Sequence, residues 1–427
     1  MSVIEIKPIE GRIDASIGIP GSKSYTNRTL LIAAMAEGES LLNQALFSED
    51  TQYMARVLRQ LGVEVESDEE ACQFRVLGMG GRIDVPGADL FVGNAGTAMR
   101  FLTGYVTLGQ GIFSVDGVQR MRERPIQDLL DGLTQLGVRA YARFGNGCPP
   151  VVVETNGLEG GRTRMAGDKS SQYFTAILLV APYARRDVEI EVMGDLVSKP
   201  YVDMTISSMA DFGVKVVNEG YERFVVKQGQ RYRARQYAIE PDASNASYFL
   251  AAAAVTGGRV RVEHISYGSA QGDVRFVDVL ERMGCQVVRD MDYLEVTGPD
   301  RLLGVDVDMN AMPDVAQTLS AIAPFAEGKT RIRNVATMQI KETDRIAALA
   351  TELRKLGVQV QEFRDGLEIQ PAHIRPAEVD TYDDHRMAMS FSVTGLKTHG
   401  VKIKDPECVK KTFPDFFERL EWLRPEK

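Results

Sequence analysis

The stretch LRQLGVEVE at residues 58–66 decides the fold, because versions of it recur along the whole chain. The other copies are LTQLGVRAY (133–141), MADFGVKVV (209–217), LERMGCQVV (280–288) and LRKLGVQVQ (353–361). Their glycines follow one another at intervals of 75, 76, 71 and 73 residues: Gly62, Gly137, Gly213, Gly284 and Gly357. The apolar residues predict a last helical turn, glycine permits the left-handed residue that ends it, and alternating valines predict a strand. This period indicates an internal repeat.

Each copy is followed by one or two predicted strands and then by a second helix with a polar start. The markers of these starts are spaced 73, 74, 73, 70 and 72 residues apart: Ser24, Thr97, Ser171, Ser244, Asp314 and Arg386. The chain therefore contains six units. The sixth ends at the helix FFERLEWL without a strand of its own, so we expect the opening strand VIEIKPI (3–9) to complete it.

Six units predict an α/β fold of two domains with three units each, since 427 residues exceed what one core usually serves. The expected domains are residues 1–21 plus 241–427, which form a discontinuous domain, and residues 22–240. A solenoid of six stacked units is the alternative. Units with several strands each exceed the common solenoid periods, which favours the two-domain interpretation.

Composition narrows the functional class. The net charge of -9, with no long basic run, disfavours a nucleic-acid partner. No apolar stretch is long enough to span a membrane, and the N-terminus lacks the features of a signal peptide. The cysteines are scattered, with only four histidines in the chain, which argues against a zinc site and suits the cytoplasm: Cys72, Cys148, Cys285 and Cys408. Neither a Walker sequence nor GxGxxG occurs.

Basic residues accompany the polar helix starts. They stand in PGSKSYTNR (20–28), QRMRERP (119–125), KETDR (341–345), DHR (384–386) and KKTFPD (410–415). A helix N-terminus with basic neighbours is an anion site, and arginine binds carboxylate and phosphate bidentately. The alternative is that the polar residues are ordinary caps and the charged runs are solvated faces. Their recurrence in both halves favours a cleft for polyanionic substrates.

Two carboxylates stand amid this positive charge. Asp314 follows a proline at a helix start, and Glu342 lies between Lys341 and Thr343. Chemistry that removes one proton and delivers another needs such a pair. The alternatives are a helix cap for Asp314 and an exposed ion pair for Glu342.

Seven motifs together resemble one family, the 5-enolpyruvylshikimate-3-phosphate synthases. They are PGSKSYTNR (20–28), GNAGTAMR (93–100), RMRERP (120–125), GDLVSKPYVDMT (194–205), KETDR (341–345), DDHRMAM (383–389) and KTFPDFF (411–417). The resemblance runs from about residue 7 to 420 and implies two domains of three βαβαββ units each, an inside-out α/β barrel. It implies transfer of the enolpyruvyl group of phosphoenolpyruvate to the 5-hydroxyl of shikimate 3-phosphate, without metal or cofactor, by a cytoplasmic monomer.

The resemblance also implies site residues. Shikimate 3-phosphate would contact Lys23, Ser24, Arg28, Ser170, Ser171, Gln172, Ser198, Tyr201, Asp314, Thr337 and Lys341. Phosphoenolpyruvate would contact Lys23, Asn94, Gly96, Thr97, Arg124, Gln172, Arg345, Arg386 and Lys411. The catalytic group would consist of Asp314, Glu342, Lys23 and His385. Asp314 would deprotonate the 5-hydroxyl, and Glu342, supported by His385, would protonate the enolpyruvyl methylene.

Three positions depart from the family pattern. Phe101 stands where proline often follows TAMR, Thr337 where many bacterial members place asparagine, and Asp168-Lys169 where uncharged residues are usual. Because glyphosate occupies the phosphoenolpyruvate niche in sensitive members, we expect Phe101 to weaken its inhibition.

Two rival functions are less favoured. The enolpyruvyl transferase that acts on UDP-N-acetylglucosamine has a cysteine before its Arg-Pro, and 114-SVDGVQRMRERP-125 has none. A non-catalytic anion-binding repeat protein would have no need for both Asp314 and Glu342.

Overall fold

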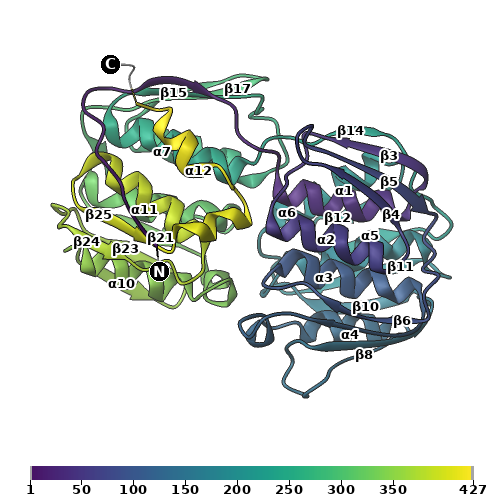
Figure 1. Ribbon diagram of the computed structural model, residues 1–427. Coiled ribbons are helices and arrows are strands. Elements are labelled where there is room, and N and C mark those ends of the chain that lie inside the picture. The colour runs from purple at the N-terminus through teal and green to yellow at the C-terminus, as the bar shows by residue number, and fades with distance from the viewer. Residues whose placement is uncertain (1, 425–427) are drawn as a thin grey trace. The chain divides into compact units, whose positions relative to one another are not determined.

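The computed structural model describes residues 2–424. The chain divides into two compact units, one formed by Met1–Pro20 with Pro241–Lys427 and the other by Gly21–Glu240 (Figure 1). We call them the discontinuous unit and the continuous unit.

One repeat of the continuous unit shows the pattern of the complete repeats. It consists of β6 (Gly87–Phe91), α3 (Gly96–Tyr105), β7 (Gln110–Asp116), α4 (Gln127–Gln135), β8 (Arg139–Ala142) and β9 (Val151–Asn156). The sheet order is β6-β7-β9-β8, in which β6 is parallel to β7 and the other neighbours are antiparallel. The two parallel strands are joined through a helix, whereas β8 and β9 form a hairpin. This is the βαβαββ unit that the sequence predicts.

Two further repeats complete the continuous unit. One consists of β14 (Gln236–Ala238), α1 (Lys23–Met35), β3 (Glu37–Asn43), α2 (Glu49–Gln60), β4 (Glu64–Asp68) and β5 (Gln73–Met79). The other consists of β10 (Gly161–Ala166), α5 (Ser171–Val180), β11 (Val188–Met193), α6 (Lys199–Asp211), β12 (Val216–Glu219) and β13 (Arg223–Val226). Short 3-10 turns are η1 (Val106–Leu108), η2 (Met121–Glu123) and η3 (Ala181–Tyr183).

The discontinuous unit has two complete repeats and one shorter one. The first consists of β2 (Asp14–Ile17), α7 (Ala243–Thr256), β15 (Arg259–Glu263), η4 (Gly272–Arg275), α8 (Phe276–Arg282), β16 (Gln286–Arg289) and β17 (Tyr293–Thr297). The second consists of β19 (Asp306–Asp308), η5 (Pro313–Val315), α9 (Ala316–Ile322), η6 (Ala323–Phe325), β21 (Thr330–Arg333), η7 (Ala336–Ile340), α10 (Arg345–Lys355), β22 (Val360–Phe363) and β23 (Gly366–Ile369). The third consists of β24 (Ala377–Val379), α11 (His385–Lys397), β25 (Val401–Lys404), η8 (Pro406–Lys411), α12 (Phe416–Glu421) and β1 (Val3–Glu5), while β18 (Leu302–Leu303) and β20 (Ala326–Glu327) form a separate short pair.

The opening strand completes the sixth repeat, as predicted. Strand β1 pairs antiparallel with β25, with Ile4 opposite Ile403. The sequence did not reveal a second exchange. Strand β2 pairs with β15, and β14 pairs with β3, so each supplies the first strand of a repeat whose other elements lie far away in sequence. The chain therefore passes from one unit to the other between a first strand and the following helix.

The repeat glycines end helices, as predicted. Each follows the second helix of its repeat, and their φ values lie between 86° and 99° at Gly62, Gly137, Gly213, Gly284 and Gly357. A side chain is disfavoured in this left-handed region, so glycine suits the turn into the next strand.

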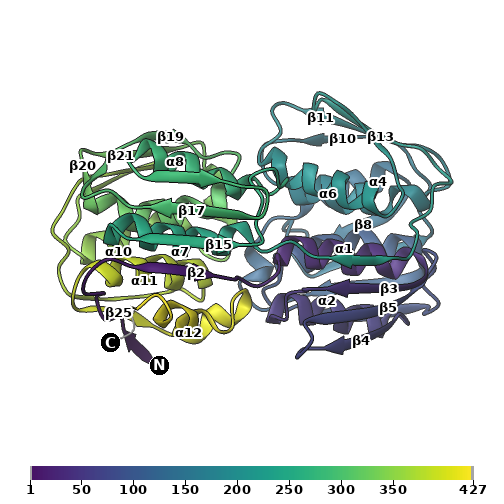
Figure 2. The same ribbon diagram turned by 90° about the horizontal axis from the view of Figure 1, so that it is seen from above.

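The first helix of each repeat lies inside its unit. In the continuous unit, α3 packs against both α1 and α5, and nearly every residue of the three is buried. In the discontinuous unit, α11 packs against both α7 and α9 in the same way. Figure 2 shows one of these helices, α1, between strands β3 and β5 on one side and strands β10 and β11 on the other. The burial of nearly all residues of these helices confirms the inside-out α/β arrangement. No helix within the described residues is long and apolar enough to cross a membrane.

Candidate active site

A buried arginine organises the predicted site residues of the discontinuous unit. Arg345 is the first residue of α10 and is only 1% exposed. Its guanidinium donates from Nε to Asp384 Oδ2 at 2.7 Å and from Nη2 to Glu342 Oε2 at 2.9 Å. A third hydrogen bond runs from Nη1 to Asp314 Oδ1 at 3.2 Å. The two predicted acid–base carboxylates thus share one cation.

Two more predicted basic residues join this cluster. Arg386 Nη2 donates to Asp314 Oδ2 at 3.0 Å, and Lys411 Nζ lies 3.6 Å from Glu342 Oε1. Glu342 is buried, so its alternative interpretation as an exposed ion pair is wrong. The same holds for KETDR as a solvated face, because Arg345 lies in the interior.

The environment of Asp314 favours its ionised form. Burial acts to raise the pKa of its carboxyl, but Arg386, Lys341 and Arg345 outweigh burial and hold this pKa well below its usual range. Asp314 is therefore a carboxylate at neutral pH, which leaves it able to accept a proton.

The remaining predicted residues of this unit lie on adjacent elements. His385 is the first residue of α11 and is fully buried. Thr337 lies in η7 and is partly exposed, and Lys341 follows directly after η7. Asp242 caps α7, since its side chain accepts a hydrogen bond from the amide of Asn245. At this helix start the alternative interpretation of the polar residues as ordinary caps is confirmed.

The continuous unit brings together five of the residues predicted to bind phosphoenolpyruvate. Arg124 Nη1 donates to the carbonyl and the side-chain oxygen of Asn94, at 3.1 and 3.2 Å. A Cβ added at Gly96 would lie 2.4 Å from Arg124 Nη2, so glycine is what allows the arginine to approach α3. Gln172 Nε2 donates to Thr97 Oγ1 at 3.2 Å, which links the starts of α5 and α3.

A second group in the same unit surrounds Arg28. Its guanidinium donates to Thr205 Oγ1 and to the carbonyl oxygens of Ser24 and Tyr201, each at 2.9 Å. It also lies over the ring of Phe101, with Cζ 5.3 Å from the ring centroid. Burial lowers the pKa of Arg28 to about 10, so it remains a cation at neutral pH.

Other predicted residues lie at the starts of α1, α5 and α6. Lys23 Nζ lies 3.3 Å from Asp50 Oδ2 at the start of α2. Ser170 caps α5, its Oγ accepting from the amide of Gln172 at 3.3 Å, and Ser171 is the first residue of that helix. Ser198 precedes α6 with a φ of 54°.

The structure supplies a partner for one unexplained departure. Lys169 Nζ donates to Asp128 Oδ1 at 3.0 Å, which ties the loop before α5 to the first turn of α4. Nothing in the structure explains Asp168.

Sequence reasoning missed the acidic residues that hold the cations. Asp384 could have been found from the sequence. It stands at a predicted helix start within DHR (384–386), where an acidic residue close to a basic one is available for pairing. Asp50 gave no signal, since nothing in the sequence connects it with Lys23.

The fold and the clusters define a class of protein, an α/β protein of two three-repeat units with basic helix starts and paired carboxylates. Within residues 2–424, no three His, Cys, Asp or Glu side chains are grouped as a metal site. The profile of the EPSP synthase family (3-phosphoshikimate 1-carboxyvinyltransferase) matches residues 7–420.

Similar proteins agree with this match over the full chain. The 3-phosphoshikimate 1-carboxyvinyltransferase of Trichormus variabilis is 53% identical over 420 residues, which cover 98% of this chain and 99% of that protein. The protein of that name from Shewanella pealeana is 48% identical over 426 residues, covering 99% and 100%. The structure of EPSP synthase from Acinetobacter baumannii superimposes with a TM-score of 0.83 at 25% identity, covering 99% and 98%. The chain therefore belongs to the EPSP synthase family and is a transferase.

Proposed function

We propose that this chain transfers the enolpyruvyl group of phosphoenolpyruvate to the 5-hydroxyl of shikimate 3-phosphate and releases phosphate. The observation that carries the proposal is the buried cluster in which Arg345 bridges Asp314 and Glu342. An anionic substrate needs cations, and a reaction that takes one proton and gives another needs two carboxylates.

The proposed reaction proceeds by addition and elimination. Asp314 takes the proton of the 5-hydroxyl while the hydroxyl oxygen bonds to the carbon that bears the phosphate. Glu342 delivers a proton to the methylene carbon, which completes a tetrahedral intermediate with a methyl group. Glu342, now a carboxylate, takes a proton back from this methyl group as the carbon–oxygen bond to phosphate breaks. The vinyl ether forms, and the proton held by Asp314 passes to the released phosphate or to solvent.

We assign binding roles to the two residue groups of the continuous unit, around Arg124 and Arg28, and to the basic residues of the discontinuous unit. Ser170, Ser171 and Ser198 stand at the starts of α5 and α6, where free N–H groups favour a phosphate. Arg124, Arg345, Arg386 and Lys411 would bind phosphoenolpyruvate, with Gln172 touching both substrates. Lys23, Ser24, Arg28, Tyr201, Thr337 and Lys341 would bind shikimate 3-phosphate. The substrates are small molecules, and we propose that the protein acts as a cytoplasmic monomer.

A coupled assay of phosphate release tests the proposal. Purified protein should release phosphate from phosphoenolpyruvate only when shikimate 3-phosphate is present, and EDTA should not reduce the rate. Release with UDP-N-acetylglucosamine in place of shikimate 3-phosphate would overturn the proposal. No release with either acceptor would favour the non-catalytic alternative.

The response to glyphosate tests the role of Phe101. This side chain is fully buried in α3, five residues after Gly96, and a Phe fits neither the volume nor the fixed φ of proline. We expect inhibition competitive with phosphoenolpyruvate, and Phe101→Pro should lower the inhibition constant by a larger factor than it changes the KM for phosphoenolpyruvate. A displacement of about 1 Å in a closely fitted site can change its rate roughly 10²-fold, and we expect an effect of this kind on the inhibitor.

The matched control is Phe101→Leu, which removes the ring but keeps a helical backbone. It should leave glyphosate inhibition nearer that of the parent than Phe101→Pro does. Equal inhibition of the parent and Phe101→Pro would show that this position does not tune sensitivity.

A further inference from the structure

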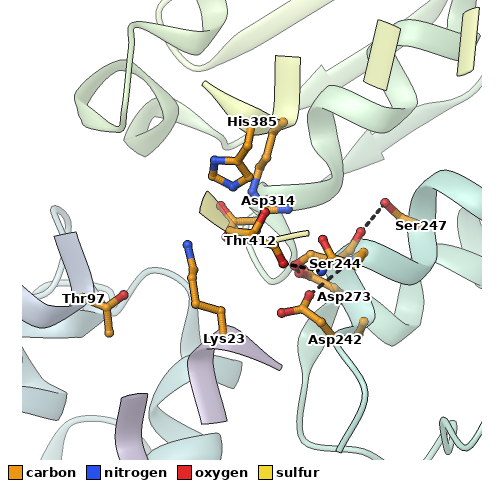
Figure 3. Close-up of polar contacts among 12 residues, drawn as sticks. Lys23, Thr97, Asp242, Ser244, Ser247, Asp273, Asp314, His385 and Thr412 are labelled. Atoms are coloured by element: carbon orange, nitrogen blue, oxygen red, sulfur yellow. Dashed lines mark hydrogen bonds and ion pairs between the residues drawn. The ribbon is translucent and has the colours of Figure 1, made fainter. Parts of the chain in front are cut away.

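A further buried carboxylate, Asp273, lies beside the cluster and has no part in the proposed reaction (Figure 3). It lies in η4 and is 5% exposed. Its Oδ2 accepts a hydrogen bond from Ser244 Oγ in the first turn of α7. Its Oδ1 accepts no hydrogen bond within residues 2–424. Figure 3 shows Asp273 among Ser244, Asp242 and Asp314.

The charges that face Asp273 come from the elements around it. Segment η4 packs against α7, α8 and η5. Asp314 of η5 and Asp242 at the start of α7 are acidic, and Arg386 of α11 is the nearby cation. Tyr248 of α7 is uncharged at neutral pH, and its hydroxyl accepts a hydrogen bond from Arg386 Nη1 at 3.3 Å. Asp278 of α8 is engaged with Arg289 and Tyr267 instead.

Asp273 changes its protonation near neutral pH. Burial, and after it the charge of Asp314, raise the pKa of the Asp273 carboxyl to about 7, against the opposing effects of Arg386 and Ser244. Like charges at close range resist joint ionisation. Only Asp314 is therefore ionised below this pH, and both carboxyls are ionised above it.

We propose that Asp273 is a positioning residue that tunes Asp314 as a base, acting through its own charge while Ser244 holds it in place. The inference rests on the proposed function, in which Asp314 removes the proton of the 5-hydroxyl. The cations that keep Asp314 ionised also make it a weak base. An ionised Asp273 offsets part of their field and strengthens the base.

The sign of the pH dependence follows from this coupling. Below about pH 7, Asp273 holds its proton and adds no charge, so Asp314 is at its weakest as a base. As the pH rises through about 7, Asp273 ionises and the proton affinity of Asp314 increases. The kcat of the parent should therefore rise across this range.

The test is the pH profile of kcat for Asp273→Asn, which keeps the shape of the side chain and cannot ionise. The ratio of parent to variant kcat should be close to one at pH 6. It should reach about 3–30 at pH 8, because a neighbouring charge shifts a carboxyl pKa by about 1–3 units and a base realises part of this in the transition state. Asp278→Asn, the same change in the adjacent helix, should keep the parental profile.

Thermal unfolding gives a second readout that does not depend on activity. A carboxyl with a raised folded-state pKa contributes stability that is present below its usual value of 3.8 and is lost as the pH rises through about 7. Asp273→Asn has no such stability to lose. The Tm of the variant minus the Tm of the parent should therefore increase between pH 5 and pH 8.

Ser244→Ala supplies a further variant if Asp273→Asn folds poorly. Losing the hydrogen bond that lowers the pKa of Asp273 should move the rise in kcat to higher pH. A constant kcat ratio for Asp273→Asn, or an unshifted rise for Ser244→Ala, would overturn the inference while leaving the proposed function intact. A parent protein without phosphate release would overturn the proposed function itself.

Discussion

Asp314→Asn is expected to lower kcat by about 10²–10⁴-fold, the usual contribution of a positioned general base. Asparagine keeps the shape of the side chain and can still accept a hydrogen bond from Arg345, but it cannot take up the proton of the 5-hydroxyl. Binding of shikimate 3-phosphate, measured by calorimetry, should largely survive. Glu342→Gln should show a loss of similar size, since it removes the proton donor.

The control for these variants is Asp300→Asn. Asp300 pairs with Arg12 on the surface, where both side chains are more than two-thirds exposed, at 87% and 72%. This variant removes one carboxylate charge without touching the cluster, so its kcat should match that of the parent. A kcat for Asp314→Asn or Glu342→Gln within about threefold of the parent would remove that residue from its proposed role.

Arg345→Met is expected to lower the free energy of unfolding by about 3–5 kcal/mol, the cost of breaking a buried ion pair by removing one partner. The variant leaves Asp384, Glu342 and Asp314 without the cation that they share. Urea titration followed by circular dichroism measures the change. Arg12→Met is the matched control, because an exposed pair contributes only about 0–1 kcal/mol.

A double-mutant cycle with Asp384→Asn identifies the cause of this loss. Removing the most deeply buried partner of Arg345 should recover part of the stability that Arg345→Met loses, because fewer carboxylates then remain uncompensated. Equal losses for Arg345→Met and Arg12→Met would contradict the view that the buried cluster is held by Arg345.

Repeat spacing made much of the fold predictable from the sequence. Gly62 and its four counterparts mark helix ends because their conformation suits glycine, and this local requirement is written in the sequence. The exchanged strands β2 and β14 were not predictable. They have four and three residues, and their partners are chosen by packing of distant segments rather than by a local pattern.

The candidate site shows the same division. Each helix start could be identified, because caps and basic residues recur at one place in the repeat. The pairing among them could not, since Arg345 meets Asp314 and Asp384 across 31 and 39 residues, and Arg386 meets Asp314 across 72. Asp273 lay outside every motif, and its burial beside Asp314 depends on how η4 packs against η5.

The proposed transfer is tested most directly by following the carbon of phosphoenolpyruvate that loses its bond to phosphate and gains a bond to the 5-oxygen. Phosphoenolpyruvate labelled with carbon-13 at the carbon that bears the phosphate is incubated with shikimate 3-phosphate and the protein in deuterated water, and NMR follows the label. We expect the label in a vinyl ether on the 5-oxygen, one phosphate per product, and deuterium in the methylene group from the intermediate methyl. Label in pyruvate, or the absence of a vinyl ether, would contradict the account.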